Sequence, residues 1–294
     1  MSMMKEYMQR KAALVNKELS GIYEEKTALN ETLAKAMNYS LMAGGKRLRP
    51  ILMMAAADAV GADGEKFVHI ASSIEMIHTY SLIHDDLPAM DNDDYRRGRL
   101  TNHKVFGEGI AVLAGDALLT MAFEVAAEDE AVSAEKRLRI VQEMSRAAGP
   151  EGMVGGQVID LESEGKQIGM DVLRRMHAAK TGTLFCAAIR SGAILGGADE
   201  AQTEALTHYA RQFGLAFQIT DDILDVIGDE AAIGKPVGSD EKNHKSTYVT
   251  LGSLESAQQL AQQAVDEAVG ALADFGPEAD FLRELVAYLL TRKK

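Results

Sequence analysis

The stretch Tyr80–Arg99, YSLIHDDLPAMDNDDYRRGR, joins a mostly apolar helical segment to a cluster of carboxylates. Clustered carboxylates repel one another and burial raises their pKa values, so an opposite charge must compensate. A hard divalent cation such as Mg²⁺ suits them, because it binds carboxylate and phosphate oxygens together. Arginine binds phosphate bidentately, so the stretch predicts a site for a metal ion and a phosphate group. The acidic and basic residues concerned are Asp85, Asp86, Asp91, Asp93, Asp94, Arg96, Arg97 and Arg99.

The spacing within this first acidic motif requires a bend in the chain. Asp85 and Asp91 are six residues apart, which places them on different faces of an ideal helix. Pro88 lies between them and lacks a backbone N–H, so the helix should end or distort there. A distorted turn could bring Asp91 back beside Asp85. The alternative interpretation is a solvated acidic loop that caps a helix.

A second acidic motif runs from Gln218 to Asp225 with the sequence QITDDILD. Asp221 and Asp225 are four residues apart and share one helix face, while Asp222 flanks that face. Apolar residues surround all three. Two acidic clusters, each set in an apolar helix, predict a metal–diphosphate site between facing helices of a bundle.

Composition narrows the class of protein. Hydrophobic residues make up 47% of the 294 residues, and the net charge of -13 argues against a nucleic-acid or anionic-membrane partner. The single cysteine, Cys186, excludes an intramolecular disulfide and is typical of a reducing compartment. No apolar run reaches the length of a membrane span, and residues 1–10 lack the apolar core of a signal peptide. We expect a soluble cytoplasmic protein without membrane insertion.

The coarse pattern predicts an all-α fold with no strands. Ala, Leu, Met, Glu and Lys dominate, there are only five prolines, and no linker-like stretch divides the chain. We therefore expect a single domain over residues 1–294. The predicted helices are 3–19, 27–42, 47–60, 64–90, 107–127, 134–148, 151–163, 170–197, 200–228, 247–273 and 278–292.

Two further motifs precede the first acidic motif. The segment 44–50, GGKRLRP, combines flexible glycines with three cations, Lys46, Arg47 and Arg49, near a helix start. It reads as an anion site, although an ordinary charged loop is the better interpretation of the motif alone. His78 and His84 lie on the helix that leads into Asp85, where a lone histidine is more often buried and hydrogen-bonded than a ligand.

Three motifs follow it. The segment 152–157, GMVGGQ, predicts close packing of a helix face, and Gln157 and Asp160 share a face that could line a polar cavity. Thr181 and Gly182 are poor helix formers, so a kink is expected beside Lys180, which by itself could be a surface lysine. The loop 234–248 carries lysines that could close over a phosphate, or could simply be solvated: Lys235 and Lys245.

Taken together, these motifs resemble the trans-prenyltransferases, the isoprenyl diphosphate synthases, over essentially the whole chain. GGKRLRP, DDLPAMD with RRG after it, GGQ, KTG, QITDDILD and GKPVGSD…KSTY appear in the order of that family. Four residues separate the aspartate pair from Asp91, as in the bacterial farnesyl diphosphate branch, to which the match is greatest. No departure from the family pattern occurs at the positions named below.

The resemblance implies an all-helical domain around a deep apolar cavity, usually a homodimer, with three Mg²⁺ ions or Mn²⁺ in their place. By motif, it assigns metal binding to Asp85, Asp86, Asp91, Asp221 and Asp225, with Asp222 less certain. It assigns the allylic diphosphate to Arg96, Lys180, Thr181, Gln218, Lys235 and Lys245. It assigns isopentenyl diphosphate to Lys46, Arg49, His78 and Arg97. The residues that carry catalysis would be Asp85, Asp91, Lys180, Asp221 and Lys235.

The implied reaction condenses isopentenyl diphosphate with dimethylallyl and then geranyl diphosphate to give farnesyl diphosphate. Tyr80 and Ser81 lie one turn before Asp85 and would set the depth of the cavity, although Tyr80 could also be an ordinary core aromatic. The alternatives are a geranyl or geranylgeranyl diphosphate synthase of the same fold and, less favoured, a non-catalytic regulatory subunit. A regulatory subunit would have lost aspartates, and a terpene cyclase would lack the isopentenyl anchors.

Overall fold

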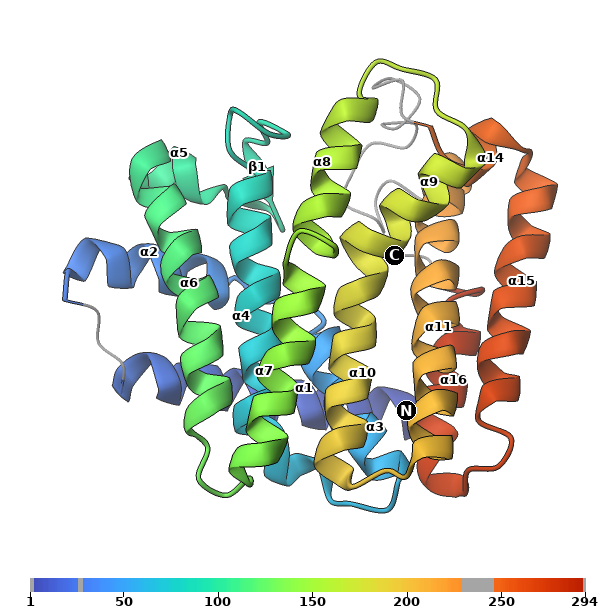
Figure 1. Ribbon diagram of the computed structural model, residues 1–294. Helices are drawn as coiled ribbons and strands as arrows, with labels where there is room; N and C mark the ends of the chain where they lie inside the picture. Colours follow the sequence, from blue (N-terminus) through green and yellow to red (C-terminus); the bar gives the residue numbers. More distant parts are fainter. Residues whose placement is uncertain (1–2, 26–28, 229–245, 293–294) are drawn as a thin grey trace. The chain divides into compact units, whose positions relative to one another are not determined.

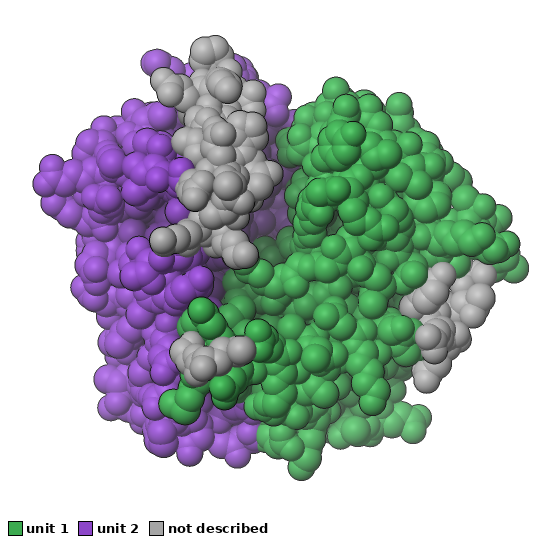
Figure 2. Space-filling view, turned by 180° about the vertical axis from the view of Figure 1, so that it is seen from behind, with its two compact units in different colours: residues 1–54, 63–141 green, residues 55–62, 142–294 purple. Residues whose placement is uncertain are grey.

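The computed structural model describes residues 3–25, 29–228 and 246–292. Clustering of backbone contacts divides the chain into two compact units, shown in different colours in Figure 2. Unit 1 comprises residues 1–54 and 63–141, and unit 2 comprises residues 55–62 and 142–294. The single domain expected over residues 1–294 stays a prediction.

Unit 1 consists of helices and one short hairpin (Figure 1). The boundaries between the units fall within two helices, α3 (Leu48–Ala59) and α7 (Ala134–Ala148). The other elements of unit 1 are α1 (Met3–Glu25), α2 (Glu31–Leu41), η1 (Gly64–Phe67), α4 (Val68–Asp85), β1 (Tyr95–Arg96), β2 (Arg99–Leu100), α5 (Asn102–Phe106) and α6 (Glu108–Glu128).

Unit 2 is helical in every described element (Figure 1). Its helices are α8 (Met153–Ser163), α9 (Met170–His177), η2 (Ala178–Gly182), α10 (Thr183–Gly196), α11 (Glu200–Ile227), α14 (Tyr248–Leu251), α15 (Leu254–Ala271), η3 (Pro277–Ala279) and α16 (Asp280–Tyr288). The all-α prediction is confirmed.

α4 forms the core of unit 1. Eleven of its residues are buried, and they point in every direction around the helix. A helix that is apolar on all sides must be surrounded by other elements. α4 packs mainly on α6, and also contacts α1 and α2. Its end therefore carries the first acidic motif on a rigid support.

α11 has the same role in unit 2. Asp199 caps its first turn through a capping box with Gln202. The helix then packs against α15 and α10, which run alongside it in Figure 1. Phe185 of α10 contacts Phe213 and Phe217 of α11 with ring centroids 5.1 and 5.2 Å apart. The second acidic motif thus follows directly after a well-packed part of α11.

The structure corrects some predicted boundaries. The helix expected over 64–90 ends at Asp85, because Pro88 cannot continue it. The helix expected over 170–197 contains a π-helical turn, η2, at the predicted kink. A hairpin, β1–β2, occurs where no strand was expected, since two residues a strand show no alternation. α5 was not predicted, and the segment 247–273 is two helices because Gly252 and Ser253 interrupt it.

α6 is the one described helix that is long and apolar enough to cross a membrane by length and composition alone. Its most apolar window has a mean hydropathy of 1.8, and 39% of that window is buried. Val112 and Leu113 are among its exposed residues. A core helix of a soluble protein passes the same test, so this feature alone does not indicate a membrane span.

Candidate functional site

The first acidic motif lies in the turn that follows α4. The Asp91 N–H donates to the Asp85 carbonyl at 2.9 Å, so the turn brings Asp91 back to the end of the helix. This confirms the distortion that Pro88 predicts. The three carboxylates lie at different depths: Asp86 is buried, Asp85 is half-buried and Asp91 is exposed.

A tight hairpin positions the arginines that follow. Tyr95 pairs with Leu100 and Arg96 with Arg99, which leaves Arg97 and Gly98 as the two-residue turn. Both have positive φ, 53° and 74°, as the turn type favoured in such hairpins requires. The hairpin brings Arg96 back to the end of α4.

Arg96 is paired with the buried carboxylate of the motif. Its Nε donates to both carboxylate oxygens of Asp86, at 2.8 and 2.9 Å, and its Nη2 lies 2.6 Å from Oδ1. Burial raises the pKa of Asp86, and the charges of Asp93 and Asp91 add to this, while Arg96 acts in the opposite direction. The arginine therefore offsets part of the effect of burial, which favours the protonated form of this carboxyl group.

The donors suit a magnesium ion in their chemistry. In the described part of the chain, no three His, Cys, Asp or Glu side chains are gathered closely enough to form a ready metal site. One reason is that Arg96 holds the carboxylate of Asp86. The turn nonetheless offers only oxygen donors, and Mg²⁺ takes a few carboxylates and completes its shell with water and phosphate oxygens.

A basic cluster surrounds His78, which lies about two helical turns before Asp85. Burial, and after it the charges of Arg49, Arg97, Arg96 and Arg47, hold the pKa of His78 well below its usual 6.5. Burial also lowers the pKa of Arg49 to about 10, which leaves it positively charged at neutral pH. These guanidinium groups form a locally positive cluster in a chain of net charge -13.

Glu75 is the counter-charge of this cluster. Its side chain is 2% exposed, and its Oε1 lies 2.9 Å from Nη1 of Arg47, which is equally buried. Arg47 also donates to Oδ1 of Asn16 at 2.9 Å and to the Leu41 carbonyl at 2.7 Å. Arg47 is thus an internal anchor of the loop, and it is the one cation of the GGKRLRP motif that the sequence comparison did not assign to a substrate.

The two glycines of the loop admit the arginine of the hairpin. Gly44 and Gly45 have φ of 86° and 124°, which L side chains rarely adopt. A Cβ on Gly45 would lie 2.7 Å from the guanidinium carbon of Arg97. Arg97 donates to the Gly44 carbonyl, so the loop and the hairpin meet at this point.

The residues predicted to set the depth of the cavity lie just before the motif. Tyr80 is buried, and its ring contacts His84 edge-on with centroids 5.6 Å apart. Burial, and then the charge of Asp85, raises the pKa of Tyr80 to about 12. Ser81 is half-buried and donates to the His78 carbonyl at 2.9 Å. Nε2 of His84 lies 3.0 Å from the Val112 carbonyl oxygen, as expected for a histidine that is hydrogen-bonded within the protein.

In unit 2, the π-helical turn η2 presents Lys180. Its ammonium lies 2.6 Å from Oδ2 of Asp160 on α8, so Lys180 is not a surface lysine. A Cβ on Gly156 would lie 2.3 Å from the Lys180 backbone nitrogen, which explains the glycine of α8 as a packing residue. π-turns occur often at functional sites, because the extra residue re-aims a side chain.

A chain of hydrogen bonds continues from η2 into α11. The Thr181 hydroxyl lies 3.4 Å from Oε1 of Gln218, and Nε2 of Gln218 donates to Oδ1 of Asp222 at 3.3 Å. The other oxygen of Asp222 accepts from the Tyr248 N–H at 2.8 Å. Asp222 is buried and uses both oxygens within the protein, which makes it a structural carboxylate. Thr181, Gln218 and Asp222 line a cavity of about 160 Å³, together with Lys180 and Asp160.

The other two aspartates of the second motif lie on one face of α11. Asp221 is exposed and Asp225 is half-buried. Asp221 contacts Nη2 of Arg292, which also donates to the Phe217 carbonyl and the Thr220 hydroxyl, both at 3.0 Å. Arg292 lies over the Phe217 ring at 4.4 Å.

A family model for polyprenyl synthetases matches residues 30–288 of the chain. The chain belongs to the polyprenyl synthetase family. It is 55% identical over 229 residues to a farnesyl diphosphate synthase of Geobacillus stearothermophilus, and the aligned region covers 77% of each chain. It is 48% identical over 273 residues to a farnesyl diphosphate synthase of Bacillus subtilis, which covers 92% of each chain.

A solved structure agrees with this assignment. The geranylgeranyl pyrophosphate synthetase of Pyrococcus horikoshii superposes with a TM-score of 0.90 at 32% identity. The match covers 98% of this chain and 99% of that one. This polyprenyl synthetase therefore has the isoprenoid synthase fold.

The structure gathers many of the predicted residues of this polyprenyl synthetase within each unit. Arg49, His78 and Arg97 meet in unit 1, and Lys180, Thr181 and Gln218 meet in unit 2. Lys46 is exposed in the loop before α3, and Arg49 lies in the first turn of α3. Lys235 and Lys245 lie outside the described residues.

Two residues of the polyprenyl synthetase site were missed from the sequence. The importance of Glu75 could have been found from the sequence, because it is the single acidic residue of the apolar segment 68–84. A lone carboxylate in a buried helix requires a partner, and several arginines follow in the sequence. Nothing in the sequence indicated a role for Arg292, since it lies in a segment of ordinary composition near residue 294.

Proposed function

We propose that this polyprenyl synthetase condenses isopentenyl diphosphate with dimethylallyl diphosphate, and then with geranyl diphosphate, to give farnesyl diphosphate. The observation that carries the proposal is the high identity to two relatives named farnesyl diphosphate synthase. The two sets of cationic and polar residues, one in each unit, support it because two diphosphates need two anchors. We assign the enzyme to the cytoplasm and to residues 1–294 as one functional domain.

The allylic diphosphate is bound on the η2 side. Lys180 supplies a charge, and Thr181 and Gln218 supply neutral hydrogen bonds, on the wall of the 160 Å³ cavity. The Lys180–Asp160 pair holds the ammonium in place while that site is empty. By motif, Arg96, Lys235 and Lys245 belong to the same set.

Isopentenyl diphosphate is bound by the basic cluster of unit 1. Arg49, Arg97 and Lys46 carry the charge, and His78 donates a neutral hydrogen bond because its pKa is low. Glu75 and Arg47 fix the loop without touching the phosphate. Fixed anchors hold the double bond in an attacking position and so reduce the entropic cost of the reaction.

Asp85, Asp86, Asp91, Asp221 and Asp225 hold the metal ions, with Mg²⁺ as the natural ion and Mn²⁺ as a substitute. When bound, three Mg²⁺ ions supply the Lewis-acid charge that assists departure of the diphosphate. The family is metal-dependent, and the number of ions is part of the proposal.

The chemistry follows from these anchors. The allylic C–O bond breaks with its electron pair on the leaving diphosphate, whose charge Lys180 and Arg96 offset. The double bond of isopentenyl diphosphate attacks the allylic cation and forms the new carbon–carbon bond. Loss of one proton, to the departed diphosphate, leaves an allylic product longer by five carbons. Apolar walls such as the buried face of α4 exclude the water that would quench the cation.

The active enzyme is a homodimer in this proposal. The exposed apolar side chains Val112 and Leu113 on α6 provide the surface, since a helix of this hydropathy is otherwise incompletely buried. Light scattering at micromolar concentration measures the mass directly. A dimer mass for the wild type and a monomer mass for Leu113→Glu are expected, and a monomeric wild type contradicts this part.

Tyr80 and Ser81 set the product length. Tyr80 is the bulky buried side chain just below the motif, and Ser81 is small. We expect Tyr80→Ala to shift the product from fifteen carbons towards twenty or more, since it removes the obstruction. An unchanged product from an active variant would place the end of the cavity elsewhere.

One experiment tests the assignment as a whole. The enzyme is incubated with labelled isopentenyl diphosphate, dimethylallyl diphosphate and Mg²⁺, and the dephosphorylated products are separated by chain length. Farnesol is expected. A main product of geranylgeraniol favours the second candidate, a geranylgeranyl diphosphate synthase, which the likeness to the Pyrococcus horikoshii structure supports. No product at all would indicate a non-catalytic subunit.

A further inference from the structure

A larger cavity lies within unit 2, on the other side of the turn that carries Lys180. Its volume is about 830 Å³, within the range of small-molecule sites. Ala178, Gly182 and Thr183 line it, whereas Lys180 and Thr181 of the same turn line the smaller cavity described above. The two cavities share His177. The proposed reaction uses none of the residues that line the larger one.

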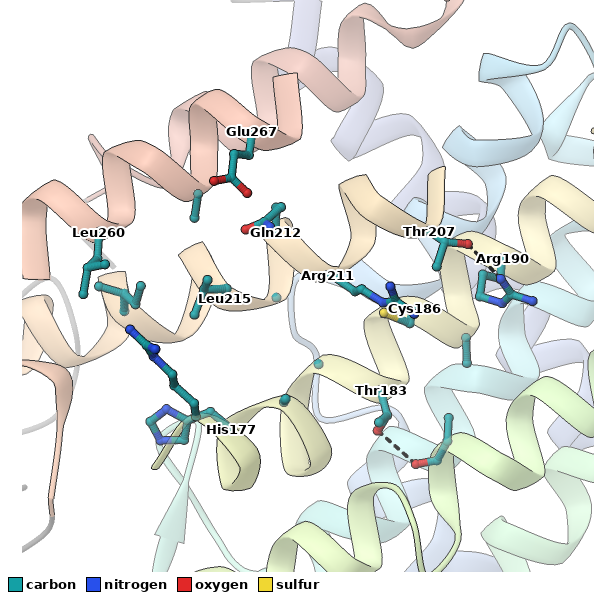
Figure 3. A pocket seen from close by; sticks show the side chains of 18 of the residues that line it. His177, Thr183, Cys186, Arg190, Thr207, Arg211, Gln212, Leu215, Leu260 and Glu267 are labelled. Atoms are coloured by element: carbon teal, nitrogen blue, oxygen red, sulfur yellow. Dashed lines mark hydrogen bonds between the residues drawn. The ribbon is translucent and has the colours of Figure 1, made fainter. Parts of the chain in front are cut away.

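The cavity is lined by apolar and small side chains together with charged ones (Figure 3). In Figure 3, Leu215 and His177 lie toward one end of the cavity and Arg190 lies toward the other. Small side chains widen the space around Leu215. The apolar and small lining residues are Ala147, Ala178, Ala187, Leu215, Ile219 and Ala264.

Four arginines and three glutamates, Glu143, Glu151 and Glu267, line the cavity, so the formal charge of its lining is positive. Arg190 is paired with Glu143 at 2.8 Å and with the Thr207 hydroxyl. Arg146, Arg174 and Arg211 also line the cavity, and none of them forms an ion pair with a described carboxylate. A cavity that combines apolar side chains with unpaired guanidinium groups suits a ligand with a hydrocarbon chain and an anionic head.

A buried hydroxyl without a partner points to a ligand independently. Tyr248 lines the same cavity and is 1% exposed, yet its hydroxyl has no hydrogen-bond partner among the described residues. Its ring lies 5.6 Å from that of His177, and the charge of Arg174 acts on it. A buried polar group normally has a partner, because leaving it without one is costly. The head of a ligand held by Arg174 would supply that partner.

We propose that this cavity is a second binding site of the enzyme, for an anionic amphiphile whose phosphate or carboxylate head meets Arg174 and Tyr248 and whose hydrocarbon chain lies on Leu215. The head groups of prenyl phosphates and of fatty acids share this chemistry. Binding here requires neither catalysis nor occupation of the proposed reaction site, so the inference does not depend on the proposed function.

The test is equilibrium binding of dodecyl phosphate, dodecanoate and dodecanol to the full chain, below their aggregation limits, by titration calorimetry. Dodecyl phosphate or dodecanoate should bind, and the tighter of the two identifies the head group. Dodecanol should bind about tenfold or more weakly than the better anion, as expected from the loss of one charge-assisted contact. Failure of both anions to bind, or equal binding of dodecanol, overturns the proposal.

Variants locate the site. Arg174→Gln should weaken binding of the better anion about tenfold, and Tyr248→Phe should weaken it by a smaller factor. Arg175→Gln is the matched control, because Arg175 is exposed beside Arg174 and does not line the cavity. Lys180→Gln should leave the affinity unchanged while it impairs the proposed prenyl transfer. Equal effects of Arg174→Gln and Arg175→Gln, or lost binding in Lys180→Gln alone, would place the probe elsewhere.

Discussion

The two acidic motifs carry the same side chains on different local structures. The first lies beyond the end of α4, in a turn closed by the Asp91–Asp85 backbone hydrogen bond. The second lies within α11, a continuous helix of 28 residues. A turn with a proline can place aspartates six apart side by side, whereas a helix needs a spacing of four. The two spacings in the sequence are thus two solutions to one geometric requirement.

The motifs also differ in which partner of their ion pair is accessible. In the first, the side chain of Asp86 is 4% exposed and that of Arg96 is 32% exposed. In the second, the side chain of Asp221 is 46% exposed and that of Arg292 is 4% exposed. The accessible member can leave its partner for a ligand at a lower cost. Arg96 is therefore available to a phosphate, and Asp221 is available to a metal ion.

The largest expected effect comes from removing one carboxylate of either motif. Asp85→Ala and Asp221→Ala should each lower kcat by about 10³-fold or more, because each removes charge that stabilises the transition state. Asp94→Ala is the control: Asp94 is exposed and lies in the same stretch, but outside the proposed metal ligands. Steady-state kinetics measure kcat of each variant, and circular dichroism checks that each variant is folded. Activity like that of the wild type in either variant would remove that motif from the metal site.

The next prediction separates the two arginines. Arg96→Gln should lower kcat/KM about 10²-fold and change stability little, since Arg96 is accessible. Arg292→Gln should lower the free energy of unfolding by about 2 kcal/mol, because it removes a buried guanidinium with three protein partners. Urea unfolding and kinetics on both variants give the comparison. A reversed pattern would show that burial does not distinguish the two pairs.

Glu75 provides a test of positioning within unit 1. Glu75→Gln keeps the shape and removes the buried charge that faces Arg47. We expect a rise of about tenfold in the KM for isopentenyl diphosphate, an unchanged KM for dimethylallyl diphosphate and a smaller fall in kcat, because the loop shifts. Glu18→Gln, at an acid bonded to His69 away from the loop, is the control. Equal rises in both KM values would indicate a general loss of structure.

The smallest effect concerns pH and His78. Its pKa in the folded protein lies below 6.5, so below that pH the unfolded chain binds more protons and stability falls. The wild type should lose stability between pH 7 and 5, measured by urea unfolding, and His78→Gln should lose less over that range. The contribution of neutral His78 to stability is complete above the pKa of histidine in the unfolded chain, and it decreases as the pH falls below that value. An identical pH dependence in both proteins would mean that His78 is not held neutral by the cluster.

Several features of the site were determined by the sequence alone. The apolar content and the scarcity of proline determined the helical class, because an amphipathic or buried helix needs only local spacing. The bend after Asp85 followed from Pro88, and the kink after Lys180 followed from Thr181 and Gly182. The close packing of α8 followed from Gly156. Each of these depends on the covalent geometry of neighbouring residues.

Only the tertiary structure decided which charges meet. That Arg47 is buried against Glu75, that Lys180 pairs with Asp160 and that Arg292 reaches Asp221 are contacts between residues 20 to 71 positions apart. Helical periodicity gives the face on which a charge lies, but not which helix covers that face. The sequence does not distinguish Arg292 and Arg47 from Arg96. Packing buries Arg292 and Arg47, which become internal anchors, and it leaves Arg96 partly exposed and so available to a ligand.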